Sequence, residues 1–394
     1  MAELAPCPAR GLHLRIAIVI ERFAPGVGGV ENVAWQVAHE LARVGENVTV
    51  IARETAGESR VPIERVFVPT FWQPLRVLAF DRAATRVAYG NRALPFDVVH
   101  SYSRTRHQDL YRAGGGSHAD YLRRSHGAFG RVARQLSPRH RVLLGIERRV
   151  FADPQQRIQC SSRLVADALV ATEGVAHDRI LLLPNGVDAA RFGAPHNREE
   201  GERLRAREDS PSAGAPLWLF PGSGWRRKGL DRVLAALAHE KARQHRVWIV
   251  GRDNPQPWKR RAAELGVADR VRFLGRRRDL EVLYHAVDAM LLPTRYDAFA
   301  NVTLEAAAAG LPIVTSPANG AAEWLGDDIC VVERADQSDA LAAALSEFES
   351  PERRRSAGKN LARRALELGW DRHIETLREE YRRIAAHPKH GASG

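Results

Sequence analysis

Short apolar runs alternate with helical patterns along this chain, and that alternation constrains its fold more than any other feature. Residues 15–20 (R-I-A-I-V-I) have the length and composition of a buried parallel strand. A glycine-rich turn at 25–31 follows, then a helical apolar pattern over 33–44 and a second strand at 48–51. The chain therefore begins with a βαβ unit whose first turn is rich in glycine.

The same alternation continues to the C-terminus. Further strands are predicted in the first half at 66–68, 98–99, 157–160 and 180–183, and in the second half at 218–220, 247–250, 271–274, 289–292, 313–314 and 329–332. Helices are predicted at 230–239, 258–265, 280–286, 302–309 and 370–384. We expect two consecutive parallel α/β halves with a boundary at 184–188. The polar stretch 196–216 is expected to be a surface excursion.

Composition excludes several classes of protein. The chain has 394 residues, 44% of them hydrophobic, and no apolar run of the eighteen or so residues that a membrane span needs. Residues 1–15 lack the apolar core of a secretory signal. Cys7, Cys160 and Cys330 show no CxxC spacing, which favours a reduced cytoplasmic compartment without disulfide or zinc.

Positive charge is concentrated in one block. The net charge is +12, and residues 101–150 contain eleven Arg against three acidic residues. Such a block favours an anionic partner, namely nucleic acid, acidic lipid or a phosphorylated glycan. The alternative is a surface merely solvated by Arg. A nucleic-acid-binding protein would need a recognition motif or interleaved aromatics, and the sequence shows neither, so nucleic acid is not predicted as a partner.

Two carboxylates flank a predicted helix start. The segment 291–305 reads L-L-P-T-R-Y-D-A-F-A-N-V-T-L-E, which places Asp297 before the helix and Glu305 in its first turns. A helix N-terminus attracts anions through its unpaired N–H groups and its dipole. A basic pair, Arg227 and Lys228, would complete a diphosphate site. The combination predicts a site for a nucleotide-sugar donor.

Nearly the whole chain resembles a known family. The matching motifs are G-V-G-G-V-E-N at 26–32, L-L-P-N-G-V-D at 182–188, R-K-G-L-D at 227–231, and 297–305 with its G-L-P-I-V tail. In this order they resemble the retaining glycosyltransferases of GT-B architecture, family 4 type. The resemblance implies two Rossmann-like domains facing across a cleft, and a C-terminal helix crossing back to the first domain.

The resemblance also implies how the domains divide the work. Residues 1–185, with a C-terminal helix at about 372–394, would form the acceptor domain, and residues 186–371 the donor domain. The form G-S-x-x-x-R-K-G at 222–229 and the Arg-rich segment after Tyr111 are most similar to the lipopolysaccharide core glucosyltransferases. They imply transfer of a hexose, glucose from UDP-glucose, to a lipopolysaccharide core or another lipid-linked glycan. The alternatives are capsule, exopolysaccharide or other glycolipid synthesis, and a non-catalytic sugar-nucleotide-binding protein.

The resemblance assigns four central roles. Arg227 and Lys228 would neutralise the diphosphate and the charge growing on the leaving nucleotide. Glu305 would accept hydrogen bonds from ribose hydroxyls, and Asp297 would orient the sugar. The alternatives are an exposed basic loop, a solvated surface Glu305 and Asp297 as a helix N-cap. The family usually has Glu where Asp297 stands and Gly where Ala300 stands.

The remaining donor contacts are assigned to backbone groups and small residues: Gly28, Gly29, Ser223, Phe299, Ala300, Asn301 and Val302. Val302 is alternatively a core residue. His118 either contacts substrate or lies in a surface loop, and Asp120 is a weaker candidate. His100 ends a strand and is expected to be structural or to line the cleft.

The resemblance implies same-face attack, with the leaving phosphate taking the acceptor proton. The sequence contains no Asp-x-Asp metal-diphosphate motif, so no metal or other cofactor is predicted. Segment 123–149 interleaves Arg with apolar residues, which suits an anionic membrane interface, a phosphorylated acceptor or a plain surface. We predict a cytoplasmic protein attached peripherally to the inner face of the cytoplasmic membrane.

Overall fold

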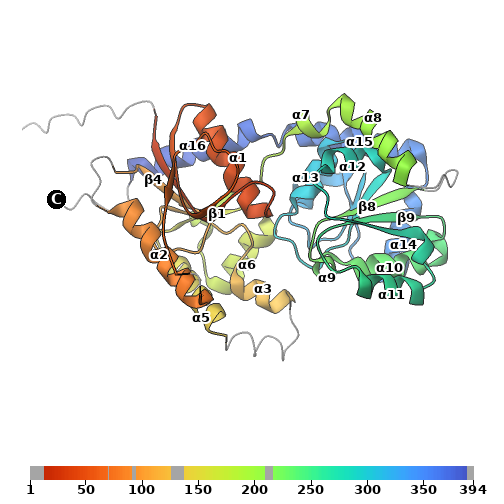
Figure 1. The fold of residues 1–394 in the computed structure, drawn as a ribbon, viewed down its shortest axis with the longest axis horizontal. Coiled ribbons are helices and arrows are strands. Elements are labelled where there is room, and N and C mark those ends of the chain that lie inside the picture. Colours follow the sequence, from red (N-terminus) through yellow and green to blue (C-terminus); the bar gives the residue numbers. More distant parts are fainter. Residues whose placement is uncertain (1–12, 70, 91–94, 126–136, 209–215, 388–394) are drawn as a thin grey trace, which may run out of the picture. The chain divides into compact units, whose positions relative to one another are not determined.

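The computed structural model describes residues 13–69, 71–90, 95–125, 137–208 and 216–387 (Figure 1). The chain forms two compact units. Unit 1 comprises 1–112, 138–158 and 374–394, and unit 2 comprises 113–137 and 159–373. This division by contacts differs from the predicted boundary after residue 185, which stays a prediction.

The first sheet has seven strands in the order β3-β2-β1-β4-β5-β6-β7. The strands are β1 (Arg15–Phe23), β2 (Asn47–Thr55), β3 (Ile63–Arg65), β4 (Val98–Ser101), β5 (Leu110–Arg112), β6 (Arg157–Cys160) and β7 (Ile180–Leu182). β1 is central and pairs in parallel with β2 and β4, with Ile16 level with Val48 and Val98. The strand predicted at 66–68 lies three residues earlier, and β5 was not predicted.

Helices of unit 1 cover this sheet because each buries an apolar stripe. They are α1 (Gly29–Arg43), α2 (Gln73–Tyr89) and α5 (Pro138–Ala152). α1 buries Val33, Val37 and Leu41, which recur at helical spacing. α2 buries Phe80 and Ala84 against the sheet. The glycine-rich turn and helix predicted at the N-terminus are therefore present.

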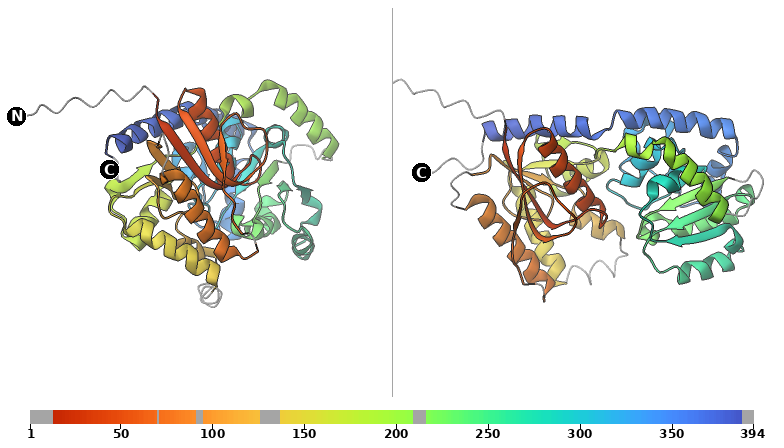
Figure 2. Two further views of the ribbon diagram at one scale, coloured as in Figure 1. Left: turned by 60° about the vertical axis from the view of Figure 1, so that its left-hand side comes forward. Right: turned by 45° about the horizontal axis from the view of Figure 1, so that its top comes forward.

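The last helix, α16 (Trp370–Ala386), begins in unit 2, and its residues from Ile374 onward belong to unit 1 (Figure 2). Tyr381 bonds the buried His100 at Nδ1, 2.7 Å away, so His100 has a structural contact. Arg378 pairs with the buried Glu46 at 2.6 Å. The implied return of the C-terminal helix is therefore confirmed. No helix among the described residues is long and apolar enough to cross a bilayer.

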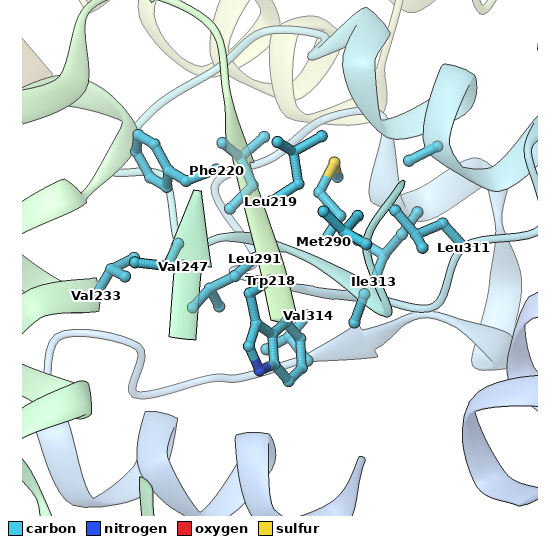
Figure 3. Packing of buried hydrophobic residues seen from close by; sticks show 14 of the residues in the cluster. Trp218, Leu219, Phe220, Val233, Val247, Met290, Leu291, Leu311, Ile313 and Val314 are labelled. Carbon is cyan, nitrogen blue, oxygen red and sulfur yellow. The ribbon is translucent and has the colours of Figure 1, made fainter. Parts of the chain in front are cut away.

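The second sheet lies in unit 2 and has six parallel strands in the order β10-β9-β8-β11-β12-β13. They are β8 (Leu217–Pro221), β9 (Arg246–Val250), β10 (Val271–Gly275), β11 (Ala289–Leu292), β12 (Ile313–Thr315) and β13 (Cys330–Val331). Their side chains form a continuous core in which Trp218, Leu219 and Met290 are completely buried (Figure 3).

Helices surround this core. They include α7 (Ala189–Phe192), α10 (Leu230–Ala238), α11 (Gln256–Glu264), α12 (Leu280–Ala286), α13 (Asn301–Ala308), α14 (Ser338–Glu347) and α15 (Pro351–Leu366). Two further helices, α3 (His118–Ser125) and α6 (Arg163–Glu173), are assigned to unit 2 but contribute no residue to this core, and α6 contacts β7 of the first sheet. The two parallel α/β halves predicted from the sequence are thus confirmed.

One prediction for this unit was wrong. The polar stretch from 196 onward contains a helix, α8 (Pro195–Glu208), rather than a loop. α8 packs on α12: a Cβ at Gly201 would meet the backbone of His285 at 2.7 Å, and Leu204 is buried. Arg205 makes two hydrogen bonds to Asp288, at 3.0 and 2.8 Å. The helix depends on this tertiary packing, because its sequence has almost no apolar stripe.

Candidate active site

The basic pair is held by a short helical turn after β8. Gly222 and Gly224 have φ of +99° and +80°, so the chain can turn sharply into α9 (Trp225–Lys228). Asp253 fixes the start of α9 by accepting hydrogen bonds from the Gly224 amide at 2.8 Å and the Trp225 amide at 3.1 Å. The predicted loop is therefore partly helical, and Lys228 is buried in it.

Ser223 lies at the edge of this turn. Its hydroxyl accepts a hydrogen bond from the Arg252 amide at 3.0 Å. The contact connects the ends of two neighbouring strands, β8 and β9. A donor-binding role for Ser223 stays a prediction.

The turn around α9 packs directly against the segment after β11. The Arg295 amide donates to the Arg227 carbonyl at 2.8 Å, and the Thr294 hydroxyl donates to the same carbonyl at 3.1 Å. Gly229 has φ of +86°, and a Cβ there would lie 2.2 Å from the Pro293 carbonyl oxygen. The two segments singled out in the sequence, some seventy residues apart, thus form one site within unit 2.

Asp297 is the centre of an ionic cluster. Its Oδ2 lies 3.0 Å from an Arg227 guanidinium nitrogen and 3.4 Å from Lys228 Nζ. Burial opposes the charge of Asp297, but Lys228 and Arg227 outweigh it and lower the pKa of the carboxyl. Burial lowers the pKa of Lys228, and Asp297 counteracts that effect. The carboxylate therefore pairs with both cations and offsets one of their two positive charges.

Glu305 occupies a different environment in α13. It is half-buried and accepts a hydrogen bond from the Tyr284 hydroxyl at 2.9 Å. Burial raises the pKa of Glu305, and Tyr284 partly offsets this. Glu305 is therefore not a solvated surface residue.

The N-terminus of α13 has no side-chain cap. Its N-cap residue is Ala300, so the alternative in which Asp297 caps the helix is wrong. The Asn301 side chain accepts a hydrogen bond from the Asn185 amide at 2.7 Å. Phe299 and Ala300 are buried, and Val302 packs partly against the core. Ala300 has φ of −79° and ψ of 96°, a conformation that does not require the glycine usual at this position.

Just before His118 in the sequence, Gly115 and Gly116 contact Tyr296, which precedes Asp297 of the candidate site. Gly116 has φ of +75°, and a Cβ there would lie 2.1 Å from the Tyr296 hydroxyl, which lies 3.4 Å from the Gly115 carbonyl. His118 begins α3 and is only 7% exposed, so it is not a surface-loop histidine. Asp120 is also buried, and its amide donates to the Ser117 hydroxyl at 3.0 Å. Substrate contact by either side chain stays a prediction.

Gly28 and Gly29 lie in unit 1, at the start of α1. Gly28 is the N-cap, and a Cβ there would lie 2.4 Å from Glu31 Oε2. The Glu31 side chain can move away, and Gly28 has φ of −162°, so neither feature requires a glycine at this position. Their approach to donor phosphates stays a prediction.

Unit 1 contains an arginine-rich pocket that the sequence analysis did not identify. It is a cavity of about 330 Å³ at the carboxyl ends of β1, β2 and β4, bordered by the first turns of α1, α2 and α5. Five cationic side chains and two carboxylates line it: Arg22, Arg53, Arg76, Arg104 and Arg139, with Glu21 and Glu31. Glu21 pairs with Arg53 at 3.2 Å and with Arg76 at 2.9 Å, so the arginines are in excess but partly paired. Tyr102 also lines it and is buried, and its hydroxyl has no hydrogen-bond partner among the described residues. The sequence signal that could have identified this pocket is an arginine close after an apolar run, as Arg22 is after residues 15–20.

The described residues bring no three His, Cys, Asp or Glu side chains together as metal ligands. The charges that could receive a diphosphate are those of Arg227 and Lys228. Independence of a metal stays a prediction.

Comparisons with known proteins give the family. The model for Glycosyltransferase Family 4 matches residues 27–191, and that for Glycosyl transferases group 1 matches residues 215–349. The chain belongs to the glycosyltransferases. The two matched regions of this glycosyltransferase contain most of the first and second sheets respectively.

Two curated relatives illustrate the range of the family. The glycosyltransferase is 27% identical over 326 residues to lipopolysaccharide glucosyltransferase WaaG of Escherichia coli strain K12, covering 80% of this chain and 83% of WaaG. It is 27% identical over 395 residues to D-inositol 3-phosphate glycosyltransferase of Geodermatophilus obscurus, covering 91% and 85% of the two chains.

Solved structures confirm the GT-B fold. The structure of WaaG, a glycosyltransferase involved in lipopolysaccharide biosynthesis, has a TM-score of 0.75 at 22% identity and covers 95% of this chain and 100% of WaaG. Anabaena Alr3699/HepE in complex with UDP and glucose has a TM-score of 0.70 at 19% identity, covering 93% and 99%.

Proposed function

We propose that this glycosyltransferase moves a hexose, glucose from UDP-glucose, with retention of configuration to a lipopolysaccharide core or another lipid-linked glycan. The observation that carries the proposal is the cluster of Arg227, Lys228 and Asp297 beside the uncapped start of α13. WaaG supports a glucosyl donor and a lipopolysaccharide acceptor, and the complexes of Alr3699/HepE with UDP and glucose support the nucleotide.

The diphosphate would exchange with Asp297 as the counter-ion of the basic pair. Its oxygens would accept hydrogen bonds from Arg227, Lys228 and the first amides of α13. Asp297, once displaced, can accept hydrogen bonds from sugar hydroxyls. The Glu305 side chain, held by Tyr284, can accept hydrogen bonds from ribose hydroxyls.

The proposed transfer breaks the bond between the anomeric carbon and the phosphate oxygen. The acceptor oxygen forms its new bond on the same face of the sugar, and its proton passes to the leaving phosphate. The products are a nucleoside diphosphate and the elongated glycan. Lys228 and Arg227 stabilise the charge that develops on the leaving group, and removing one such donor typically costs about 100- to 1,000-fold in rate.

The arginine-rich pocket of unit 1 suits an anionic group on the acceptor. Tyr102 and Arg53 add donors, because the Tyr102 hydroxyl and the Arg53 Nε have no hydrogen-bond partner among the described residues. The Geodermatophilus relative is named for a phosphate-bearing compound, D-inositol 3-phosphate. We expect Arg76→Gln to raise the KM for a phosphorylated acceptor and to leave that for its dephosphorylated form unchanged.

Purified variants test the donor site with UDP-glucose and a lipopolysaccharide core acceptor. Lys228→Ala and Glu305→Ala should each reduce transfer about 100-fold or more while the protein remains folded. Arg226→Ala is the matched control, because this neighbouring side chain is exposed. Near-normal turnover in Lys228→Ala would remove the donor-site assignment. Unchanged transfer in a chelator would support metal independence.

The alternatives give different results in the same assays. Transfer only to a capsule or exopolysaccharide precursor would keep the donor site and replace the acceptor. A non-catalytic binder would bind UDP-glucose without transferring glucose to any acceptor or to water.

A further inference from the structure

Three large aromatic side chains are exposed within six consecutive residues of unit 1. Phe67 is 92% exposed, Phe71 82% and Trp72 52%. The only other exposed large hydrophobics among the described residues are Val331 and Leu366, which lie in unit 2. We call Phe67, Phe71 and Trp72 the aromatic group. Such clustering marks an interaction site, because exposed apolar residues are normally scattered.

The aromatic group is anchored to a rigid helix. Trp72 is the N-cap of α2, and its carbonyl accepts a hydrogen bond from the Arg76 amide at 3.0 Å. Pro74 in the first turn restricts the backbone further. Trp72 is therefore presented at a defined end of α2, directly after Phe71.

Positive charge surrounds this end. α2 and α5 lie side by side (Figures 1 and 2), and their first turns meet, because Arg76 and Arg139 line the same pocket. Exposed arginines continue along both helices: Arg82 and Arg86 on α2, and Arg139, Arg141, Arg148 and Arg149 on α5. This positive potential would attract an anionic surface, whereas it would repel a second copy of the basic chain.

No aliphatic side chain of the predicted membrane segment 123–149 is exposed in α5. Residues 126–136 of segment 123–149 lie outside the described residues. In the part that α5 contains, Leu143 and Ile146 are buried in the protein, and Val142 and Leu144 are half-buried. That part exposes arginines but no aliphatic or aromatic side chain, so among the described residues the exposed aromatic side chains come from another segment.

We propose that the aromatic group inserts into the interface of an anionic bilayer, while the exposed arginines of α2 and α5 bind its headgroups. Tryptophan is favoured at the level of the headgroups, and phenylalanine deeper among the acyl chains. The proposal rests on the proposed function, because it assigns the membrane contact of an enzyme that acts on a lipid-linked acceptor. It is tested without donor or acceptor, so its failure is distinguishable from failure of the transfer assay.

The test is cosedimentation of the full chain with vesicles of phosphatidylethanolamine and phosphatidylglycerol, and with neutral phosphatidylcholine vesicles. We expect binding to the anionic vesicles, weakened by salt. The triple variant Phe67→Ser/Phe71→Ser/Trp72→Ser should lower the partition coefficient by about tenfold or more. Leu366→Ser is the matched control, because it removes a 69% exposed apolar side chain from unit 2.

Brominated lipids provide a second measurement, since bromine quenches tryptophan at short range. Wild-type fluorescence should be quenched, and Trp72→Phe should lose that quenching while still binding. Vesicle binding unchanged in the triple variant would overturn the proposal. So would an aromatic-dependent dimer that does not bind vesicles.

Discussion

The substitution Asp297→Asn separates two proposed roles of the Asp297 carboxylate: stabilising the fold and binding the donor sugar. The wild-type carboxylate lies 3.4 Å from Lys228 Nζ, and the Lys228 side chain is only 8% exposed. At an effective dielectric constant of 20, that pair attracts by about 5 kcal/mol. Removing one partner of a buried pair typically costs about 3–5 kcal/mol, since the other charge stays buried without compensation.

We expect Asp297→Asn to destabilise unit 2 by about 3 kcal/mol, because the Asn oxygen still accepts a hydrogen bond from Arg227. The corresponding fall in Tm is roughly 6–12 °C. UDP should bind about tenfold tighter, since the diphosphate no longer competes with a carboxylate, which corresponds to about 1.4 kcal/mol. Transfer should nevertheless slow, because the sugar loses its carboxylate.

Thermal unfolding with and without UDP and calorimetric titration with UDP measure these changes. The double variant Lys228→Met/Asp297→Asn should recover much of the lost stability, since no buried cation remains. Asp269→Asn, which alters an exposed carboxylate of the same unit, is the control. Unchanged stability together with weaker UDP binding in Asp297→Asn would refute the reasoning.

Three further predictions concern single contacts. Burial raises the pKa of Glu305 in the folded protein above its ordinary 4.5. The protonated carboxyl therefore stabilises the folded protein fully below pH 4.5, and this stabilisation is lost as the pH rises through the folded-state pKa. In urea unfolding, Glu305→Gln should therefore be more stable than wild type at pH 8 and equal at pH 4; greater wild-type stability at pH 8 would contradict the assignment. Gly116→Ala should cost about 2 kcal/mol, as both its positive φ and the Tyr296 hydroxyl oppose a Cβ, and an unchanged Tm would exclude this contact. Tyr381→Phe should cost about 1 kcal/mol and increase hydrogen exchange in α16, because it removes the hydrogen bond to His100; equal exchange would show that the bond does not hold the helix.

Features that depend on local pattern were predicted well. The strand 289–292 and the helix 280–286 have the observed bounds, because a short apolar run and an amphipathic repeat depend on neighbouring residues. The order of the βαβ units follows from the same local signals. The helix α8 was missed since its stability comes from α12, some eighty residues later.

The amino-acid sequence by itself determined the parallel α/β architecture and the family, through strand periodicity and motifs whose residues lie close together in the chain. Only the tertiary structure decided that Asp297 pairs with Arg227 and Lys228, that arginines from separate segments line one pocket, and that Phe67 and Phe71 are exposed. The physical reason is that burial and charge pairing depend on which distant segments pack together, and no local sequence pattern shows which segments will meet.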